Sequence, residues 1–487
     1  MPEKEYETVI GLEVHTELKT KTKIFCGCST EFGGAPNSHT CPICLGLPGG
    51  LPKLNRQAVE FGIRAGIALN CKVNNVSLFD RKNYFYPDSA LNYQISQFYQ
   101  PIDTNGYLDI NLADGTTKRI RINRAHLEAD AGKLIHMGES VLSSEGTYVD
   151  YNRVSVPLLE IVTEPDMSSA EEAIAYVEGL REILSFVGVS DCKMEEGSIR
   201  VDVNISVREK GSNKLGVRAE IKNLNSLKHI VKAIEVEVNR HIDALENGTE
   251  ILVQQTRTFD AEKGKTFAMR EKVNAADYRY FPEPNIPPVI ISEEWIESVR
   301  KCLPELPKER RQRMVQQYGL PIYDAEVLTS SREMSDYFDT VLEYYPDAKV
   351  ISNWMMGELL KALNNTGQSI NNCLVSAKML ADLLLMIEKG TINGKIAKTV
   401  LDEMMKSGKK AEIIVQEKGL LQVSDQSAVL EVVDEAIDAN PKIVADYLAG
   451  KDKAIGALIG QIMQLSKGKA NPQLANELLM KRLQELK

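Results

Sequence analysis

Long apolar runs are missing from this sequence. No stretch approaches the roughly 18 consecutive apolar residues that a membrane-spanning helix needs. The first residues, Met-Pro-Glu-Lys-Glu-Tyr-Glu, lack the apolar core of a secretory signal. The sequence also lacks an excess of positive charge: the formal net charge of −10 argues against a protein that coats nucleic acid indiscriminately, although a local basic surface can still bind RNA. We therefore expect a soluble, cytoplasmic protein with no membrane partner.

Two common catalytic motifs are missing as well. Gly132-Lys133 lacks the other members of a Gly-x-x-x-x-Gly-Lys-Ser/Thr loop, so the sequence excludes a P-loop nucleotide site. No serine nucleophile with a suitable lysine is present, and no glutaminase signature surrounds the isolated cysteines. The chain is therefore not expected to release ammonia from glutamine, and a partner must supply ammonia if the reaction consumes it.

The length of 487 residues favours two or three domains. Residues 6 to about 288 alternate β-branched runs with turn residues, and apolar residues recur at helical spacing at 56–69, 169–187 and 227–247. Four prolines at 282, 284, 287 and 288 indicate a boundary, after which the sequence becomes helical, with a second hinge at 406–410. We predict an α+β fold: a strand-rich domain at 1–292, a helical domain at 293–408 and a helical tail at 409–487.

Four of the eight cysteines stand in two close pairs, Cys26-Gly-Cys28 and Cys41-Pro-Ile-Cys44. Stable disulfides are not expected in a reducing compartment, whereas four thiolates brought together by a folded-back loop suit structural zinc. A closed site of this kind would brace a loop and would not activate water. The alternative is four buried or reactive thiols, which leaves the matched pairing unexplained.

Acidic residues recur at strand spacing. Glu13 and His15 lie on one face of a predicted strand, as do His126 and Glu128, while Glu160 is embedded in an apolar run. Several carboxylates facing one sheet imply a cation, and oxygen ligands favour Mg²⁺ or Mn²⁺. His15 by itself fits a hydrogen-bonded core histidine equally well.

Basic residues near these strands are candidates for binding phosphate, because guanidinium and ammonium groups pair with its oxygens. Surface ion pairing is the alternative for each one. The candidates are Arg81, Lys82, Lys222, Arg257, Arg270 and Arg279.

The end of the chain is electrically uneven. Acidic residues outnumber basic ones eight to two at 411–450, whereas basic residues lead seven to three from 451 onward. This basic end is a candidate RNA contact, and an ordinary solvated helix surface is the alternative. The residues concerned are Lys451, Lys453, Lys467, Lys469, Lys481 and Arg482.

Several long strings resemble the GatB family, the B subunits of aspartyl/glutamyl-tRNA(Asn/Gln) amidotransferases, and they extend over essentially the whole chain. They are Val9-Ile-Gly-Leu-Glu-Val-His15, Cys41-Pro-Ile-Cys-Leu-Gly-Leu-Pro-Gly49, Phe79-Asp-Arg-Lys-Asn-Tyr-Phe-Tyr-Pro-Asp88, Tyr93-Gln-Ile-Ser-Gln97, Met194-Glu-Glu-Gly-Ser-Ile-Arg200, Ala219-Glu-Ile-Lys-Asn-Leu-Asn-Ser226, Asp277-Tyr-Arg-Tyr-Phe-Pro-Glu-Pro284 and Lys467-Gly-Lys-Ala-Asn-Pro472.

The resemblance implies a cradle domain related to glutamine-synthetase-like kinases, a helical domain, and a tail similar to the small YqeY proteins. It implies a heterotrimer with an amidase A subunit and a small C subunit. ATP would phosphorylate the side-chain carboxyl of mischarged Asp-tRNA(Asn) or Glu-tRNA(Gln), and ammonia from the amidase would displace the phosphate. By resemblance, Glu13, His15, Glu128 and Glu160 form the catalytic magnesium site, Cys26, Cys28, Cys41 and Cys44 bind zinc, and the helical domain and tail hold the tRNA.

The sequence departs from the family pattern at two places. Ala129 stands where a second glutamate is expected, and Ser89-Ala-Leu-Asn92 replaces a string that usually carries a proline. Neither departure removes an assigned residue. Strand alternation would turn Ala129 to the face opposite Glu128 and Asp130, so this departure bears on the detailed shape of the carboxylate pocket.

Two other functions compete with this one. A noncatalytic zinc-braced RNA-binding scaffold has no need for convergent carboxylates. A free-standing kinase or ligase for small carboxylates has no need for a helical tail.

Overall fold

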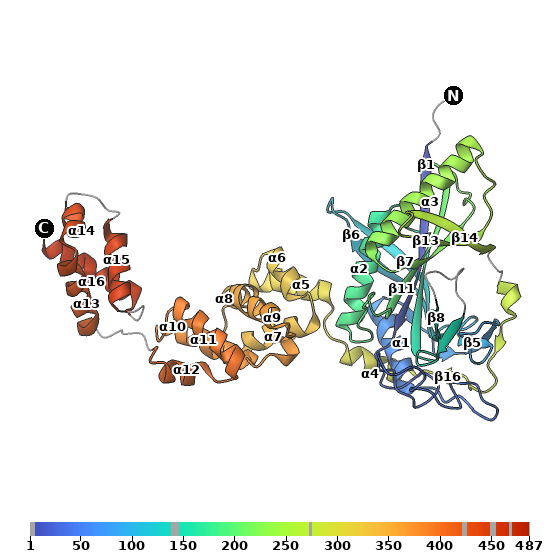
Figure 1. Cartoon of the computed structure of the whole chain (residues 1–487), viewed down its shortest axis with the longest axis horizontal. Helices are drawn as coiled ribbons and strands as arrows, with labels where there is room; N and C mark the ends of the chain where they lie inside the picture. The colour runs from blue at the N-terminus through green and yellow to red at the C-terminus, as the bar shows by residue number, and fades with distance from the viewer. Residues whose placement is uncertain are drawn as a thin grey trace. The chain divides into compact units, whose positions relative to one another are not determined.

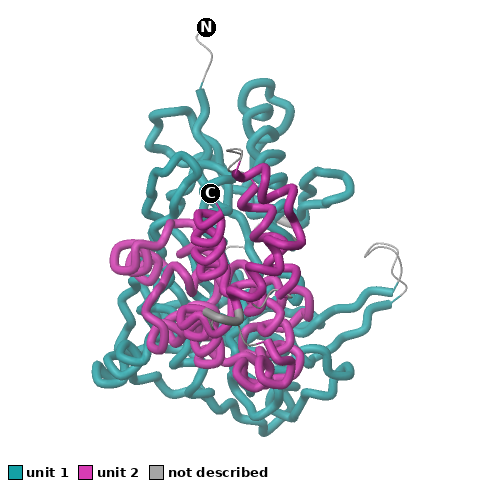
Figure 2. The backbone as a smooth tube through the Cα atoms, turned by 90° about the vertical axis from the view of Figure 1, so that its left-hand side faces the viewer, with its two compact units in different colours: residues 1–307 teal, residues 308–487 magenta. Residues whose placement is uncertain are grey.

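The computed structural model describes residues 5–137, 146–271, 275–420, 426–448, 454–466 and 470–486. The chain forms two compact units, residues 1–307 and 308–487 (Figure 2). Within the described ranges, no helix combines the length and apolar character that crossing a bilayer requires.

A nine-stranded sheet forms the centre of the first unit (Figure 1). Its strand order is β14-β13-β12-β11-β1-β10-β7-β6-β2, and all neighbours run antiparallel except the parallel pair β12 and β13. The strands are β1 (Tyr6–Glu17), β2 (Lys72–Val73), β6 (Asp103–Asn111), β7 (Thr117–Ala129), β10 (Pro157–Thr163), β11 (Ile199–Glu209), β12 (Ala219–Leu224), β13 (Gln255–Asp260) and β14 (Lys265–Glu271).

The two faces of this sheet differ in polarity. In β1, Ile10, Leu12 and Val14 are at most 1% exposed and belong to one apolar cluster, whereas Glu13 and His15 point to the other face. Helices α1 (Arg56–Ala68), α2 (Ala170–Phe186) and α3 (Leu227–Asn247) contribute to the same cluster. The apolar face is therefore closed by helices, and the opposite face is left for polar side chains.

The three predicted helices in this unit are confirmed to within one residue at each end. Each begins at a side chain that caps the first turn: Asn55, Ser169 and Ser226 accept hydrogen bonds from backbone N–H groups of α1, α2 and α3. Such caps explain why the sequence locates these helix starts so closely.

Smaller sheets and one further helix complete this unit. They are β3 (Val76–Ser77) with β16 (Val289–Ile290); β5 (Tyr93–Ser96), β4 (Asp80–Asn83) and β15 (Phe281–Pro282); β8 (Lys133–His136) with β9 (Thr147–Asp150); and α4 (Glu293–Cys302). Helix α4 packs on α1, and its Ile296 and Val299 lie in the apolar cluster of this unit.

The second unit is helical where it is described and contains two separate apolar clusters, one at 314–415 and one at 429–483. The longer helices around the first are α5 (Pro307–Tyr318), α7 (Arg332–Tyr344), α10 (Ala377–Glu388) and α11 (Gly394–Ser407), with shorter α6 (Ile322–Leu328), α8 (Ala348–Trp354), α9 (Leu360–Thr366) and α12 (Ala411–Glu417). Around the second are α13 (Gln426–Ala439), α14 (Pro441–Leu448), α15 (Ala454–Leu465) and α16 (Pro472–Glu485). A large sheet followed by many helices agrees with the predicted α+β class.

Asp103 at the start of β6 is a buried carboxyl group in the apolar interior. Its side chain is 0% exposed, and neither carboxyl oxygen has a hydrogen-bond partner among the described residues. Burial raises the pKa of Asp103 well above its usual range. The carboxyl is therefore protonated in the folded chain under conditions in which the unfolded chain would ionise it.

We expect Asp103→Asn to stabilise the first unit near pH 7, because the amide is buried without having to take up a proton, and each unit by which burial raises the Asp103 pKa corresponds to about 1.4 kcal/mol. Because the folded-state pKa is raised, the unfolded chain releases this proton first, and stability falls as the pH rises above about 4. The amide carries no such term, so the two proteins should converge near pH 4. Urea unfolding from pH 4 to 8 measures the difference, and parallel curves would contradict the assignment.

Candidate functional site

Four neighbouring strands place a row of ionisable side chains on the polar face. The register pairs His126 of β7 with Glu160 of β10, Glu160 with His15 of β1, and His15 with Arg200 of β11. Directly paired residues point to the same side of an antiparallel sheet. Residues distant in the sequence are thus brought side by side by strand pairing alone.

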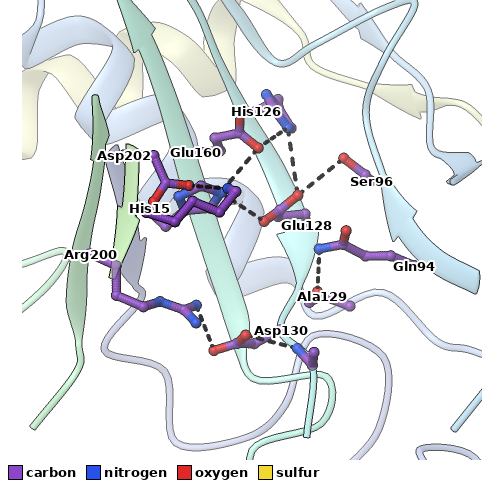
Figure 3. A network of polar contacts seen from close by, with 12 residues as sticks. His15, Gln94, Ser96, His126, Glu128, Ala129, Asp130, Glu160, Arg200 and Asp202 are labelled. Carbon is purple, nitrogen blue, oxygen red and sulfur yellow. Dashed lines mark hydrogen bonds and ion pairs between the residues drawn. The ribbon is translucent and has the colours of Figure 1, made fainter. Parts of the chain in front are cut away.

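His15, Glu128 and Glu160 form the first cluster of this face (Figure 3). His15 Nε2 lies 3.4 Å from Glu160 Oε2 and 3.7 Å from Glu128 Oε1. His126 Nε2 approaches the same carboxylates at 3.3 and 3.8 Å, and Ser96 Oγ donates to Glu128 over 3.4 Å. One ligand atom from each of the three clustered residues lies within 4.8 Å of the others, a spacing that a single cation can bridge.

The electrostatics of this cluster show how strongly it favours positive charge. Burial lowers the pKa of His15, but the carboxylates of Glu160 and Glu128 outweigh burial and raise it to about 9. Burial raises the pKa of Glu160, yet the two imidazoles bring it well below its usual range. Two carboxylates and an imidazole fit a divalent cation that prefers oxygen and nitrogen ligands.

A second acidic cluster lies next to the first. Glu13, Asp202 and Glu220 also bring one ligand atom each to within 4.8 Å of the others. Asn204 Nδ2 donates to Glu13 over 2.8 Å, and the Lys222 ammonium contacts Asp202 and lies 3.1 Å from Glu220. Strand spacing predicted that Glu13 and His15 share a face, and the family resemblance implied that they share one magnesium site; in the structure they belong to neighbouring clusters.

Two adjoining hollows, each of about 370 Å³, open over these clusters. His15, Lys82, Lys222 and Tyr278 line both hollows. Burial lowers the pKa values of both lysines. Tyr280 and the carboxylates of Glu128 and Glu160 outweigh burial for Lys82, and Asp202 and Glu220 outweigh it for Lys222, so both pKa values are raised and each ammonium stays charged. The site therefore offers cation ligands and positive groups side by side, an arrangement suited to a metal and a phosphate held together.

The site contains residues that the sequence did not assign. His126, Asp202 and Glu220 belong to the clusters, and Tyr278 and Tyr280 line the hollows. His126 and Asp202 could have been found from their strand spacing with Glu128 and Asn204. Glu220 could have been found in the same way, because it stands at strand spacing from Lys222, and the pairing of β12 with β11 brings both residues to the site.

The other predicted basic residues are not brought together with Lys82 and Lys222. Arg81 pairs with Glu283 at 2.6 and 2.9 Å. Arg257 points to the helix-covered face, where it lies 3.3 Å from Glu237 and bonds Thr266. Arg279 is exposed and lines neither hollow, and the side chain of Arg270 lies outside the described residues. The sequence did not show which residues of β13 face the site. Alternation along the strand turns Thr256 toward the hollows and Arg257 toward the helices.

Arg81 joins β4 to the β15 segment. The Glu283 side chain is 0% exposed, and the Arg81 guanidinium lies 4.3 Å from the centre of the Tyr93 ring. We expect Arg81→Met to destabilise the first unit by about 3–5 kcal/mol, because it leaves a buried carboxylate without its partner. Urea unfolding measures this loss, and Arg119→Met, which breaks an exposed pair with Asp109, is the control. Unchanged stability with weakened ATP binding would instead favour a phosphate-binding role for Arg81.

The four paired cysteines come together. Their sulfur atoms lie within 4.8 Å of one another, and Cys44 Sγ is 3.9 Å from Cys41 Sγ. Zinc bound tetrahedrally at about 2.3 Å would hold its sulfurs about 3.8 Å apart, so the cluster fits that metal. Cys71, Cys192, Cys302 and Cys373 lie outside it.

The basic end of the chain is described only in part. Lys451, Lys453, Lys467 and Lys469 lie outside the described residues. Lys481 is exposed on α16, and Arg482 forms an ion pair with Asp434 at 2.6 Å. Ala129 is buried in the apolar cluster, on the face opposite Glu128, as strand alternation predicted.

Histidine, carboxylates and lysines on the polar face of a large antiparallel sheet define a site for cations and anionic groups together. Residues 8–297 match a family described as the GatB/GatE catalytic domain, and residues 336–483 match one described as the GatB domain. The chain therefore belongs to the GatB family, and the resemblance seen in the sequence is confirmed.

Full-length relatives agree with this assignment. Over 483 residues the chain is 53% identical to the B subunit of the aspartyl/glutamyl-tRNA(Asn/Gln) amidotransferase of Carboxydothermus hydrogenoformans, covering 99% of this chain and 100% of that protein. The protein of the same name from Caldicellulosiruptor saccharolyticus is 54% identical over 485 residues, with coverage of 99% and 100%. That from Caldanaerobacter subterraneus is 53% identical over 478 residues, with coverage of 98% and 99%.

Proposed function

We propose that this chain is the carboxyl-activating B subunit of a tRNA-dependent amidotransferase. It would use ATP to phosphorylate the side-chain carboxyl of Asp-tRNA(Asn), Glu-tRNA(Gln) or both, and ammonia from a partner would then form the amide. The observation that carries the proposal is the pair of acidic clusters, around His15 and around Glu13, with Lys82 and Lys222 beside them.

Activation solves a leaving-group problem. A free carboxylate resists attack by ammonia because oxide or hydroxide is a poor leaving group. When a carboxylate oxygen attacks the γ-phosphorus of ATP, the bond to ADP breaks and an acyl phosphate forms. Ammonia then adds to the acyl carbon, inorganic phosphate leaves with the C–O bonding electrons, and a proton is lost from nitrogen to solvent.

Residues of the two hollows suit these steps. His15, Glu128 and Glu160 would hold one divalent cation, and Glu13, Asp202 and Glu220 would hold another. Held by these residues, Mg²⁺ or Mn²⁺ would supply positive charge that offsets negative charge in phosphoryl transfer. Lys82 and Lys222 would bind phosphate oxygens, and the Tyr278 ring, 5.0 Å from Lys82 Nζ, would help keep that lysine in place.

The sections predicted from the sequence would divide the work. Residues 1–292 would be a kinase-type cradle related to glutamine-synthetase-like enzymes, with the cysteine cluster holding structural zinc, and α4 would lead into the helical section. Residues 293–408 and a YqeY-like tail at 409–487 would bind tRNA, the tail through Lys481, Arg482 and the basic residues near them. An amidase A subunit and a small C subunit would complete a heterotrimer and supply ammonia from glutamine.

The acidic clusters favour this function over its alternatives. A noncatalytic scaffold does not require Glu128 and Glu160 to be nearly buried beside two histidines, and burying these charged groups costs free energy that a scaffold could avoid with apolar side chains. A free-standing ligase for small carboxylates would leave the second, helical unit without a role.

The test uses the chain co-expressed with its A and C partners, γ-labelled ATP and Mg²⁺, without glutamine or ammonia. We expect label release that requires Asp- or Glu-charged tRNA and is absent with uncharged tRNA. Intact tRNA binding without release would favour the scaffold. Equal release without tRNA would favour the free-standing ligase.

A further inference from the structure

Lys23 lies beneath the cysteine cluster and takes no part in the proposed reaction. Its side chain is 0% exposed, although lysine is rarely buried without a partner. The ammonium lies 3.8 Å from Cys44 Sγ and donates to the carbonyl oxygens of His39 and Tyr151 over 2.7 and 3.2 Å. All three of its protons therefore have acceptors, one of them a sulfur of the cluster.

The Lys23 ammonium can compensate part of the negative charge of a metal-bound cysteine cluster. Four thiolates around a divalent metal carry a net charge of −2, and a buried negative charge is costly unless a positive group lies near it. Among the described residues, Lys23 is the cationic side chain that contacts a cluster sulfur. Its ammonium would halve the uncompensated charge.

The same lysine also connects the cysteine cluster to Asp130, a residue that lines one of the two hollows. Tyr151, which accepts a hydrogen bond from Lys23, lies two residues before Arg153. The Arg153 guanidinium donates to the carbonyl oxygens of Ala131 and Gly132 over 3.0 and 2.9 Å. Arg153 also lies 3.4 Å from Asp130, which lines the hollow. Further bonds run in parallel, because Asn37 and Asn152 link the cysteine loop to residues 149–152.

We propose that Lys23 is the internal counter-ion of a tetrathiolate zinc site. We also propose that it holds the cysteine loop against residues 149–153, which in turn contact Asp130. The inference rests on the zinc assignment within the proposed function. It adds a positioning residue that contacts neither metal nor substrate but sets how tightly the metal is held.

The experiment compares Lys23→Met with Lys21→Met in the full complex. Lys21 is exposed in the same loop and is the matched control. Zinc content is measured first, then the rate of zinc transfer to a coloured chelator. We expect Lys23→Met to release zinc at least ten-fold faster than the unmodified chain, and Lys21→Met to release it at the unmodified rate. Cobalt substitution should show a shifted sulfur-to-cobalt charge-transfer band only in Lys23→Met.

A purely structural role would behave differently. If Lys23 acts through the metal, excess zinc should restore the melting temperature of Lys23→Met. A loss of stability that is equal at every zinc concentration, with unchanged release, would overturn the proposal. If Lys23→Met does not accumulate, Lys23→Gln, which keeps donors without charge, should show the same fast release. An unmodified chain that binds no zinc would remove this inference and the zinc assignment but leave the label-release test unaffected.

Discussion

Glu160→Gln should lower tRNA-dependent label release from γ-labelled ATP by about 1,000-fold or more. The substitution keeps the volume of a nearly buried side chain but removes a charge that lies 3.4 Å from His15 and 3.3 Å from His126. A metal at such a site contributes several kcal/mol of transition-state stabilisation, and each 1.36 kcal/mol is about ten-fold in rate. The measurement is initial-rate release by the complete complex at saturating charged tRNA.

The matched control is Glu164→Gln. Glu164 directly follows β10, the strand that carries Glu160. Glu164 accepts a hydrogen bond from Asn123 and lines neither described hollow. The rate of label release by Glu164→Gln should therefore stay within about two-fold of that of the unmodified protein. Titration with Mn²⁺ should show weaker binding in Glu160→Gln and unchanged binding in Glu164→Gln. An active Glu160→Gln complex with normal Mn²⁺ binding would refute the cation site.

Cys44→Ser should reduce bound zinc from about one per chain to none. Cys44 is 1% exposed, and its sulfur contacts both Cys41 and Lys23. Structural zinc binds free peptides with apparent free energies of about 10–16 kcal/mol. Only part of that energy should appear here, because the first unit also has a large apolar cluster, so we expect a fall in melting temperature without complete unfolding.

Cys302→Ser supplies the control for this change. Cys302 is exposed at the end of α4 and lies outside the cluster, so metal content and melting temperature should stay as in the unmodified chain. A chelator should lower the melting temperature of the unmodified protein toward that of Cys44→Ser and leave Cys44→Ser unchanged. Full zinc content in Cys44→Ser would contradict the four-sulfur site.

Some features were open to prediction because they depend on residues close together in the chain. The helices α1, α2 and α3 follow from apolar spacing and from the caps Asn55, Ser169 and Ser226. The cysteine cluster was also predictable, because the two close pairs are joined by a short loop that can fold back and bring all four sulfurs together. Alternation along β1 also placed Glu13 and His15 on one face.

Other features depended on which strands pair and in what register. Nothing local distinguishes Arg81, which is held by Glu283 about 200 residues away, from Lys82, which turns into the hollows. Glu220 joins Glu13 only because β12 and β1 are both neighbours of β11.

The sequence by itself determined the family, the α+β class, the helix starts and the residue types that supply the chemistry, because these follow from local spacing and from long matching strings. The tertiary structure decided how those residues are grouped: two acidic clusters in place of one, Arg81 and Arg257 in ion pairs, and Lys23 beneath the cysteines. The physical reason is that a strand shows two faces with a period of two, but only its pairing partners, chosen by burial across the whole sheet, decide which side chains meet.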